Sequence, residues 1–206
     1  MSVLFIGALI VAALMGGLAW QGSLVRKSWE GVARKLGLSI TPHTWGTQPS
    51  MNGTYKGVKV SVHCEKVRHG RHTTYLTTYC ADLDYRVPPD LEIFHEGLLA
   101  RLEVLATGED IEVGYPELDR RFIIRGTSSA EAEEFLRRPG VALALIRLHK
   151  QERGTVLRRR NLTLEINHQE GRASRMEARI EALVTAAAVI NHSVQAPAPK
   201  DEAAAW

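Results

Sequence analysis

The distribution of apolar and polar positions separates an apolar beginning of the chain from a mixed remainder. Residues 3–20 read VLFIGALIVAALMGGLAW, a run of eighteen positions without a polar side chain. A helix of this length covers about 27 Å, close to the roughly 30 Å hydrocarbon core of a bilayer. Because backbone groups in lipid must bond within their own segment, the pattern predicts a transmembrane helix over residues 1–22.

The same run also has features of a cleaved signal peptide. Its Gly17-Leu18-Ala19 stretch offers small residues suited to a cleavage site. A signal peptide normally begins with basic residues, however, and none precedes the run. The transmembrane helix is therefore the leading interpretation and the signal peptide the alternative.

Small residues recur along the predicted helix at Ala8, Ala12 and Gly16, four positions apart. Such a face lets two helices approach closely in a membrane. It predicts a homodimer through these residues, and the alternative is that alanine and glycine are simply common in membrane helices.

Charge around the run predicts its orientation. The first 25 residues carry no charge, and Glu30 is the only acid near the basic residues that follow, which are Arg26, Lys27, Arg34 and Lys35. Basic residues favour the cytoplasmic side of a membrane. We therefore expect the N-terminus outside and the main domain in the cytoplasm, with Trp20 and Trp29 at the membrane interface.

Residues 23–38 form a predicted juxtamembrane amphipathic helix. Val25, Trp29, Val32 and Leu36 fall at helical spacing, and Gly37 suits the position after a helix end. Two interpretations stay open. In one, the basic residues contact anionic lipid headgroups, and in the other, the apolar stripe packs on the following domain.

Residues 39–194 predict one α+β domain built on an antiparallel sheet. Strand alternation is clear from Val58 to Cys64, and a turn is expected near Gly70. Strands are also expected at 73–85, 91–94, 121–125, 155–159 and 162–167, and helices at 97–107, 128–137, 141–151 and 172–194. The elements lack a regular strand–helix alternation, which favours α+β over a parallel sheet. We expect a linker at 41–51 and a flexible tail at 195–206.

Composition adds limits rather than an identity. The chain has 206 residues, 45% of them hydrophobic, with a net charge of +3, so it suits an ordinary folded domain. This charge is small, which argues against nucleic acid as a partner. The two cysteines exclude a disulfide-rich scaffold. Cys64 and Cys80 are expected to be reduced thiols that do not face each other.

Two stretches resemble a family of uncharacterised bacterial proteins with a single membrane anchor. One is TGEDIEVGYPELDRRF at 107–122, and the other is a W-x-x-x-A-x-x-L-G-L pattern from Trp29 to Leu38. Tyr115 and Leu118 stand where the family usually has aspartate and phenylalanine. The resemblance implies a fold and a membrane anchor, and it implies no activity.

Common cofactor and hydrolase motifs are missing from the sequence. No G-x-x-x-x-G-K-[ST], G-x-G-x-x-G or G-x-S-x-G occurs, and Leu99 replaces the second histidine of a possible zinc helix at His95. We therefore expect no cofactor.

One group of residues has the chemistry of a metal site. His63, Cys64, His69 and His72 lie on a predicted hairpin, and imidazole with thiolate suits zinc or copper. Their spacing matches no four-ligand pattern, so the favoured interpretation is a solvated hairpin tip and no metal.

Two carboxylates are weak catalytic candidates. Asp82 and Asp84 alternate on a predicted strand, which would place both on one face about 7 Å apart. Such a pair can hold Mg²⁺ or act as acid and base. No nucleophile or phosphate-binding loop accompanies them.

A basic run at Arg158, Arg159 and Arg160 is a candidate anion-binding site. Lipid phosphates are one possible ligand. The alternative is a charged strand edge that prevents aggregation.

These observations favour a non-enzymatic, membrane-anchored cytoplasmic domain that binds a partner protein or organises a membrane complex. One alternative is a membrane-bound hydrolase or transferase that uses Asp82 and Asp84. The other is a module that binds anionic lipid.

Overall fold

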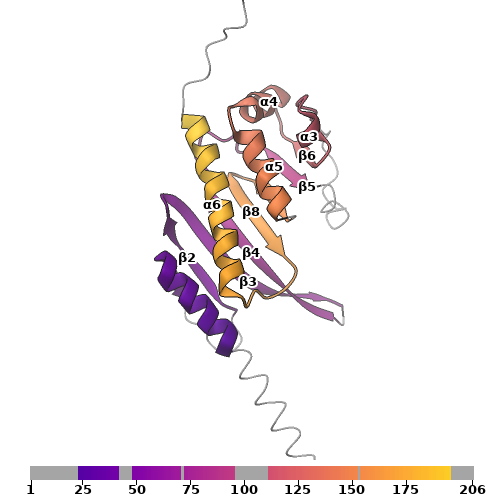
Figure 1. Cartoon of the computed structure of the whole chain (residues 1–206). Helices are drawn as coiled ribbons and strands as arrows, with labels where there is room; N and C mark the ends of the chain where they lie inside the picture. The colour runs from indigo at the N-terminus through magenta and orange to yellow at the C-terminus, as the bar shows by residue number, and fades with distance from the viewer. Residues whose placement is uncertain (1–22, 42–47, 71, 96–110, 153, 196–206) are drawn as a thin grey trace, which may run out of the picture.

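Antiparallel strands form the frame of the protein in a computed structural model that describes residues 23–41, 48–70, 72–95, 111–152 and 154–195. The described strands make one 8-stranded sheet in the order β1-β2-β3-β4-β8-β7-β5-β6 (Figure 1). They are β1 (Ser39–Thr41), β2 (Ser50–Tyr55), β3 (Val58–His69), β4 (His72–Asp82), β5 (Glu92–His95), β6 (Phe122–Arg125), β7 (Thr155–Arg158) and β8 (Asn161–Ile166).

Helices cover one face of this sheet. They are a helix at residues 23–36, here called the N-terminal helix, and α3 (Pro116–Asp119), α4 (Ser129–Arg137), α5 (Val141–Gln151) and α6 (Ala173–Gln195). Figure 1 shows α6 running along the sheet with α5 beside it. The helix start predicted at residue 128 is confirmed, because Ser128 is the N-cap of α4 and its side chain accepts a hydrogen bond from the Glu131 backbone N–H at 3.2 Å.

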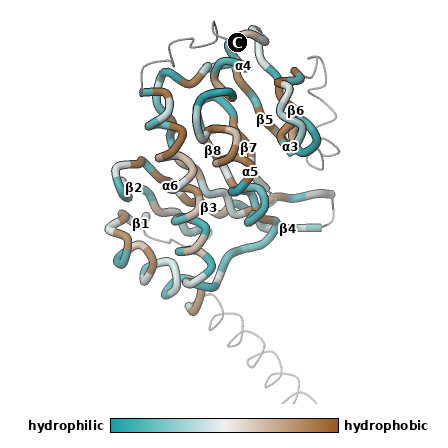
Figure 2. The backbone as a smooth tube through the Cα atoms, turned by 45° about the horizontal axis from the view of Figure 1, so that its top comes forward, coloured by the Kyte–Doolittle hydropathy of each residue, from teal (hydrophilic) through white to brown (hydrophobic). Residues whose placement is uncertain are grey.

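The two faces of the sheet have different chemistry. Alternate residues of β3, β4 and β8 are buried in the core beneath the helices, among them Val62, Tyr79 and Leu164. Figure 2 shows hydrophobic colouring on β5, β7 and β8 in the middle of the fold. On the other face, the register aligns a row of polar residues across five strands: Asp82, Asn161, Arg158, Glu92 and Arg125. This is the one-sided pattern of an antiparallel sheet.

The N-terminal helix packs on the domain through its apolar stripe. Trp29 is 0% exposed, and Val32 and Ala33 are also buried. The Trp29 indole N–H donates to the Glu170 backbone carbonyl at 2.8 Å. Of the two interpretations of this helix, packing is what the structure shows for the apolar stripe. Its basic residues Arg26, Lys27, Arg34 and Lys35 lie on the exposed side.

Strands β3 and β4 extend beyond their neighbours. β2 pairs with β3 only as far as His63, and β8 pairs with β4 only from Thr77 onward. The rest of the hairpin, from Cys64 to Leu76, is a two-stranded projection that we call the β3–β4 arm. Figure 1 shows it leaving the body of the sheet at the lower right.

The transmembrane part of the expected fold class has to be corrected. Within the described ranges, no helix is long and apolar enough to cross a membrane. The longest, α6, carries Arg175, Glu177, Arg179 and Glu181 in its first half. The fold is therefore described as α+β without the single-pass transmembrane helix. The segment predicted to span, 1–22, lies outside the described residues, and so do Ala8, Ala12, Gly16 and Trp20.

Several element boundaries also differ from those expected. The predicted linker at 41–51 overlaps β1 and β2, which pair with each other through Ile40 and Met51. The hairpin turn between β7 and β8 falls at Arg159-Arg160, one residue earlier than predicted. The helix expected at 97–107 and the tail after Gln195 lie outside the described residues.

Candidate functional site

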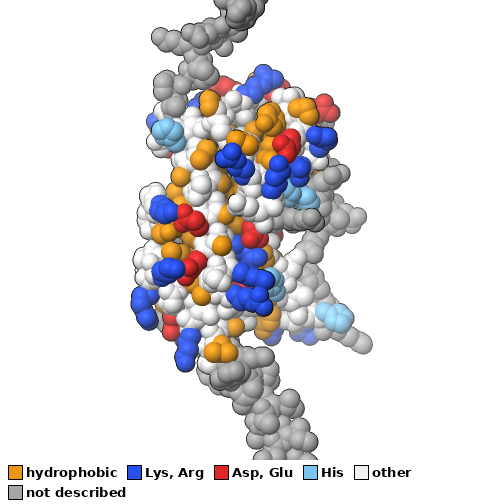
Figure 3. Space-filling model, in the orientation of Figure 1, with side chains coloured by type: hydrophobic (Ala, Val, Ile, Leu, Met, Phe, Trp, Pro, Cys, Tyr) orange, Lys and Arg blue, Asp and Glu red, His pale blue; other side chains and the backbone are white. Residues whose placement is uncertain are grey.

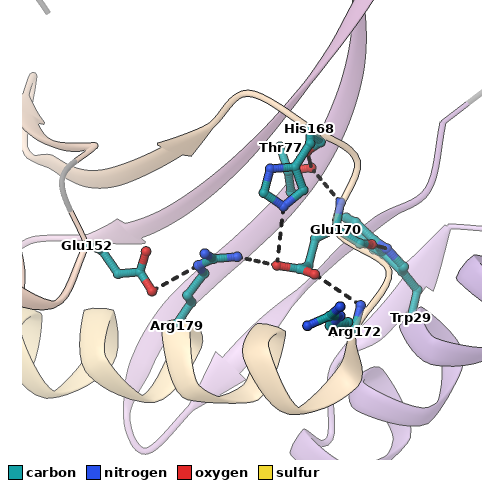
Figure 4. Close-up of polar contacts among 7 residues, drawn as sticks. All are labelled: Trp29, Thr77, Glu152, His168, Glu170, Arg172 and Arg179. Atoms are coloured by element: carbon teal, nitrogen blue, oxygen red, sulfur yellow. Dashed lines mark hydrogen bonds and ion pairs between the residues drawn. The ribbon is translucent and has the colours of Figure 1, made fainter.

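A buried carboxylate, Glu170, ties three parts of the fold together (Figure 4). Its side chain is 2% exposed and forms an ion pair with Arg179 of α6. Arg179 also contacts Glu152, which follows α5, with 3.0 Å between Nε and Oε1. The Glu170 backbone N–H donates to the Thr77 hydroxyl of β4 at 3.2 Å, and that hydroxyl donates to the His168 carbonyl at 2.7 Å.

The chemistry of this cluster is structural. Tyr79 lies next to it, and burial raises the pKa of its hydroxyl above the ordinary value, with the charge of Glu170 adding to the effect. A carboxylate that is 2% exposed has no room for a substrate beside it. The cluster therefore fixes α6 against the sheet and against the end of α5.

Beside this cluster lies a groove between α5 and α6. The two helices are antiparallel, because Gly140 at the start of α5 lies near Val189, and Glu152 after α5 pairs with Arg179. The groove has a volume of about 730 Å³. We call it the α5–α6 groove, and its lining includes Leu143, Ala144, Arg147, Leu148, Ala178, Glu181, Ala182, Thr185, Ala186 and Val189.

The groove is largely apolar and open to solvent. Leu143 is 41% exposed and Val189 is 38% exposed, although both are large hydrophobic side chains. Figure 3 shows hydrophobic side chains gathered on this face, with charged side chains around them. Contiguous exposed apolar surface on a folded protein commonly marks a place where another molecule binds.

The charged side chains that line the groove differ in whether they have an ion-pair partner. Glu181 pairs with Lys56 and accepts a hydrogen bond from the Tyr55 hydroxyl at 3.0 Å. The hydrogen bond from Lys56 is the main cause that lowers the pKa of Glu181. Glu152 is held by Arg179. Arg147, in contrast, makes no ion pair with any residue in the described part of the chain. Arg147 is therefore a cation of the groove without an ion-pair partner among the described residues.

The two carboxylates predicted as a catalytic pair lie in different environments. Asp82 ends β4 and lines a hollow on the open face of the sheet with Lys59 and Ser61. Asp84 lies beyond the strand, and its carboxylate accepts hydrogen bonds from the Arg86 backbone N–H and from the Gln195 side chain, each at 3.0 Å. Because β4 ends at Asp82, strand alternation no longer places the two on a common face.

The histidines and the cysteine of the possible metal site are spread along the hairpin of β3 and β4. His63 pairs with Thr78, whereas the backbones of His69 and His72 face each other at the tip. Cys64 is buried in the core, and His63 is exposed. In the described residues, no three His, Cys, Asp or Glu side chains are grouped so that they could hold a metal ion.

The three arginines of the basic run at the β7–β8 turn contact different parts of the protein. Arg158 forms an ion pair with Glu92 on the open face of the sheet. Arg159 and Arg160 form the turn itself, with φ of 49° and 63°. Arg160 donates from Nε to the Val87 carbonyl at 2.9 Å. The three guanidinium groups therefore do not converge on one anion.

The predicted cysteine arrangement is confirmed. Cys64 pairs with Thr77, and Cys80 pairs with Ser61, so the two thiols do not face each other. Both are free cysteines.

The α5–α6 groove was not predicted from the sequence, although a signal for it exists. Ala178, Ala182, Ala186 and Val189 follow each other every three or four residues on α6. They form a second apolar stripe beside the one assigned to the core. Leu143 similarly lies off the buried face of α5.

Fold and groove together define a two-layer α+β domain with an open apolar groove on its helical layer. No family model, no curated protein and no solved structure matches the chain. The resemblance to uncharacterised membrane-anchored proteins therefore stays a prediction.

Proposed function

We propose that this protein is a binding domain whose α5–α6 groove accepts an amphipathic helix of a partner protein. The observation that carries the proposal is the exposed apolar lining at Leu143 and Val189, together with the unpaired Arg147. The partner helix would place its apolar face in the groove and an acidic side chain next to Arg147.

The dimensions of the groove suit a short helix. Its α6 wall extends from Ala178 to Val189, which corresponds to about 16 Å or three helical turns. Small side chains at Ala178, Ala182 and Ala186 keep this wall low, so a third helix can approach α6 closely. An amphipathic helix in an apolar groove is a common mode of peptide recognition, with anchors every three to four residues.

The groove is also held in place before any partner binds. Its two ends are fixed by the contacts of Arg179 with Glu152 and by the packing of Gly140 against α6, where a Cβ on Gly140 would lie 3.1 Å from Val189. A groove that needs little reorganisation loses less binding free energy to ordering.

Binding is favoured over the hydrolase or transferase alternative. Asp82 and Asp84 lie in separate environments, and the Asp84 carboxylate accepts hydrogen bonds from Arg86 and Gln195. The groove itself contains no pair of carboxylates facing each other across a reaction centre, because Glu152 and Glu181 are both held in ion pairs.

The test uses site-specific photocrosslinking on the full chain. A photoreactive residue at Leu143 should crosslink a partner in cells, and the same residue at Thr54 on the open face of the sheet is the matched control. The crosslinked region of the partner should be an amphipathic helix with an acidic residue. We expect Arg147→Glu to weaken binding of the corresponding synthetic peptide at least tenfold.

A charge exchange completes the experiment. Replacing the acidic residue of the peptide by lysine should restore binding to the Arg147→Glu variant, and Leu143→Asp should abolish binding without unfolding the protein. Equal crosslinking at Leu143 and Thr54, or unchanged binding in both groove variants, would show that the proposal is wrong.

A further inference from the structure

Several basic side chains without an ion-pair partner lie at one end of the molecule. They come from three elements: the N-terminal helix, the start of α6 and the β3–β4 arm. Among the described residues, none of them forms an ion pair, and all are exposed: Lys27, Lys66, Arg68, Arg172 and Arg175. We call this set the basic end.

Contacts around residues 168–172 bring the three elements together. A Cβ on Gly171 would lie 3.4 Å from Val25 of the N-terminal helix. Thr77 of β4 donates to the His168 carbonyl. In the arm, Lys66 pairs with Tyr75, two residues from Thr77 along β4, a spacing of about 7 Å on the same side of the strands. Figure 1 shows the start of the N-terminal helix, the start of α6 and the arm at the lower end.

The positive charges of the arginines at the start of α6 are unfavourable for the stability of that helix. The N-terminal end of a helix carries partial positive charge and favours acidic side chains. The first turn of α6 has no acidic residue, and Arg175 lies in it, with Arg172 immediately before the helix. Neither is compensated by an ion pair with a described residue. Two positive charges at this position lower the stability of the helix slightly, which points to a role outside folding.

Exposed apolar surface at the same end helps to identify which anionic ligand the basic end binds. Leu24 is 44% exposed and lies one turn before Lys27, and the chain that leads into it is apolar from Val3 to Trp20. Basic residues beside an exposed apolar side chain match the charged surface and the shallow apolar layer of a bilayer. Binding of a single-stranded nucleic acid relies on stacking of bases on aromatic residues, and Tyr75 is the single Phe, Tyr or Trp residue in the described part of the arm.

We propose that the basic end binds the surface of an anionic membrane through lipid phosphates. Lys27, Arg172 and Arg175 face the headgroups, Lys66 and Arg68 extend the contact along the arm, and Leu24 enters the interface. This surface is separate from the α5–α6 groove, so either proposal can fail without the other.

The test measures binding of the full chain to vesicles of neutral phosphatidylcholine and to vesicles that contain 30% phosphatidylglycerol. The quantity of interest is the ratio of the two affinities, because apolar insertion contributes to both. Each basic residue near an anionic surface is worth about fivefold in affinity. We expect Arg172→Glu/Arg175→Glu to lower the ratio at least tenfold, and 500 mM salt to do the same for the unaltered chain.

The matched control is Arg147→Glu/Arg159→Glu, which makes the same change in net charge away from the basic end and should change the ratio less than twofold. Thermal unfolding separates binding from folding, because glutamates at the start of α6 should keep or raise Tm. An equal ratio for both double variants overturns the proposal. So does salt-dependent binding to a DNA duplex when the chain shows no preference for anionic vesicles.

Discussion

Arg179 and Glu170 form an ion pair in which the carboxylate side chain is 2% exposed and the guanidinium side chain is 12% exposed. The pair joins α6 to the loop that precedes it. In this loop, the backbone of Glu170 hydrogen-bonds to the side chains of Trp29 and Thr77. A buried carboxylate next to a buried arginine requires its partner, because either charge alone would remain desolvated.

Replacing Glu170 by glutamine should therefore destabilise the fold. The variant leaves Arg179 with Glu152 as its carboxylate partner, so the loss is that of a charge-assisted contact, and we expect the free energy of unfolding to fall by about 1.5 kcal/mol. Urea denaturation measures this change. The control is Glu133→Gln, which removes an exposed ion pair with Arg137 and should cost under about 0.5 kcal/mol. Equal losses would show that Glu170 is not a structural centre.

Two glycines should respond in opposite ways to alanine. A Cβ on Gly154 would lie 2.2 Å from the Glu165 backbone oxygen of β8. Because backbone cannot move aside cheaply, Gly154→Ala should lower the free energy of unfolding by at least about 2 kcal/mol. A Cβ on Gly31 meets nothing within 4 Å in the N-terminal helix, so Gly31→Ala should raise it by about 0.5–1 kcal/mol. Chemical denaturation of both variants decides the matter.

Asp84 should contribute to the acid sensitivity of the protein. Its hydrogen bond from the Arg86 backbone N–H, followed by that from Gln195, lowers the pKa of the carboxyl below its usual value. A lowered pKa in the folded state means stability that is present above the unfolded pKa of about 3.9 and lost as pH falls through the folded pKa.

The Asp84→Asn variant tests this contribution. It should be less stable than the unaltered chain at pH 7, and it should lose less stability between about pH 5 and pH 2. Denaturation midpoints across this range give both quantities. Parallel curves for the two proteins would contradict the assignment.

Cys80 should be a slow nucleophile. Burial, followed by the charge of Asp82, raises the pKa of its thiol to about 11. At pH 8 the thiolate fraction is then roughly 200-fold below that of an ordinary thiol with a pKa near 8.5. Reaction of a Cys64→Ser variant with a disulfide reagent should be slow by a similar factor, and it should reach the normal rate in urea. Asp82→Asn should speed the reaction of the folded protein.

Many of the helices and strands could be predicted from the local pattern of apolar and polar residues. The alternation from Val58 to Cys64 predicted β3, the capping box at Ser128 predicted α4, and the stripe through Met176 and Ile190 predicted α6. These signals are short-range, because period, caps and buried faces are properties of a few consecutive residues.

The pairing of distant segments was not accessible in this way. β5 lies between β6 and β7, so Ile93 faces both Ile124 and Leu157, and no local signal encodes this order. The start of β2, at Ser50 and Met51, falls in the predicted linker because residues 41–51 contain two prolines, a glycine and several polar residues. Its strand conformation comes from pairing with β3, where Met51 is buried opposite Val62.

The candidate site was the least predictable part. Reactive side chains such as His63 and Asp82 are conspicuous in the sequence, yet neither lines the α5–α6 groove. The groove consists of alanines and exposed aliphatic residues whose meaning depends on how α5 packs beside α6. Arg147 is unremarkable in the sequence and becomes distinctive because its neighbours Glu152 and Glu181 are occupied by Arg179 and Lys56.

The length of α6 sets a fixed separation within the protein. Its 23 residues correspond to about 33 Å from Ala173 to Gln195, and contacts with β3, β4 and β8 keep it in place. The helix α6 therefore keeps a ligand bound at the basic end at a constant distance from Gln195. Spin labels at positions 174 and 195 should give one narrow distance distribution, and a broad or bimodal one would contradict a fixed separation.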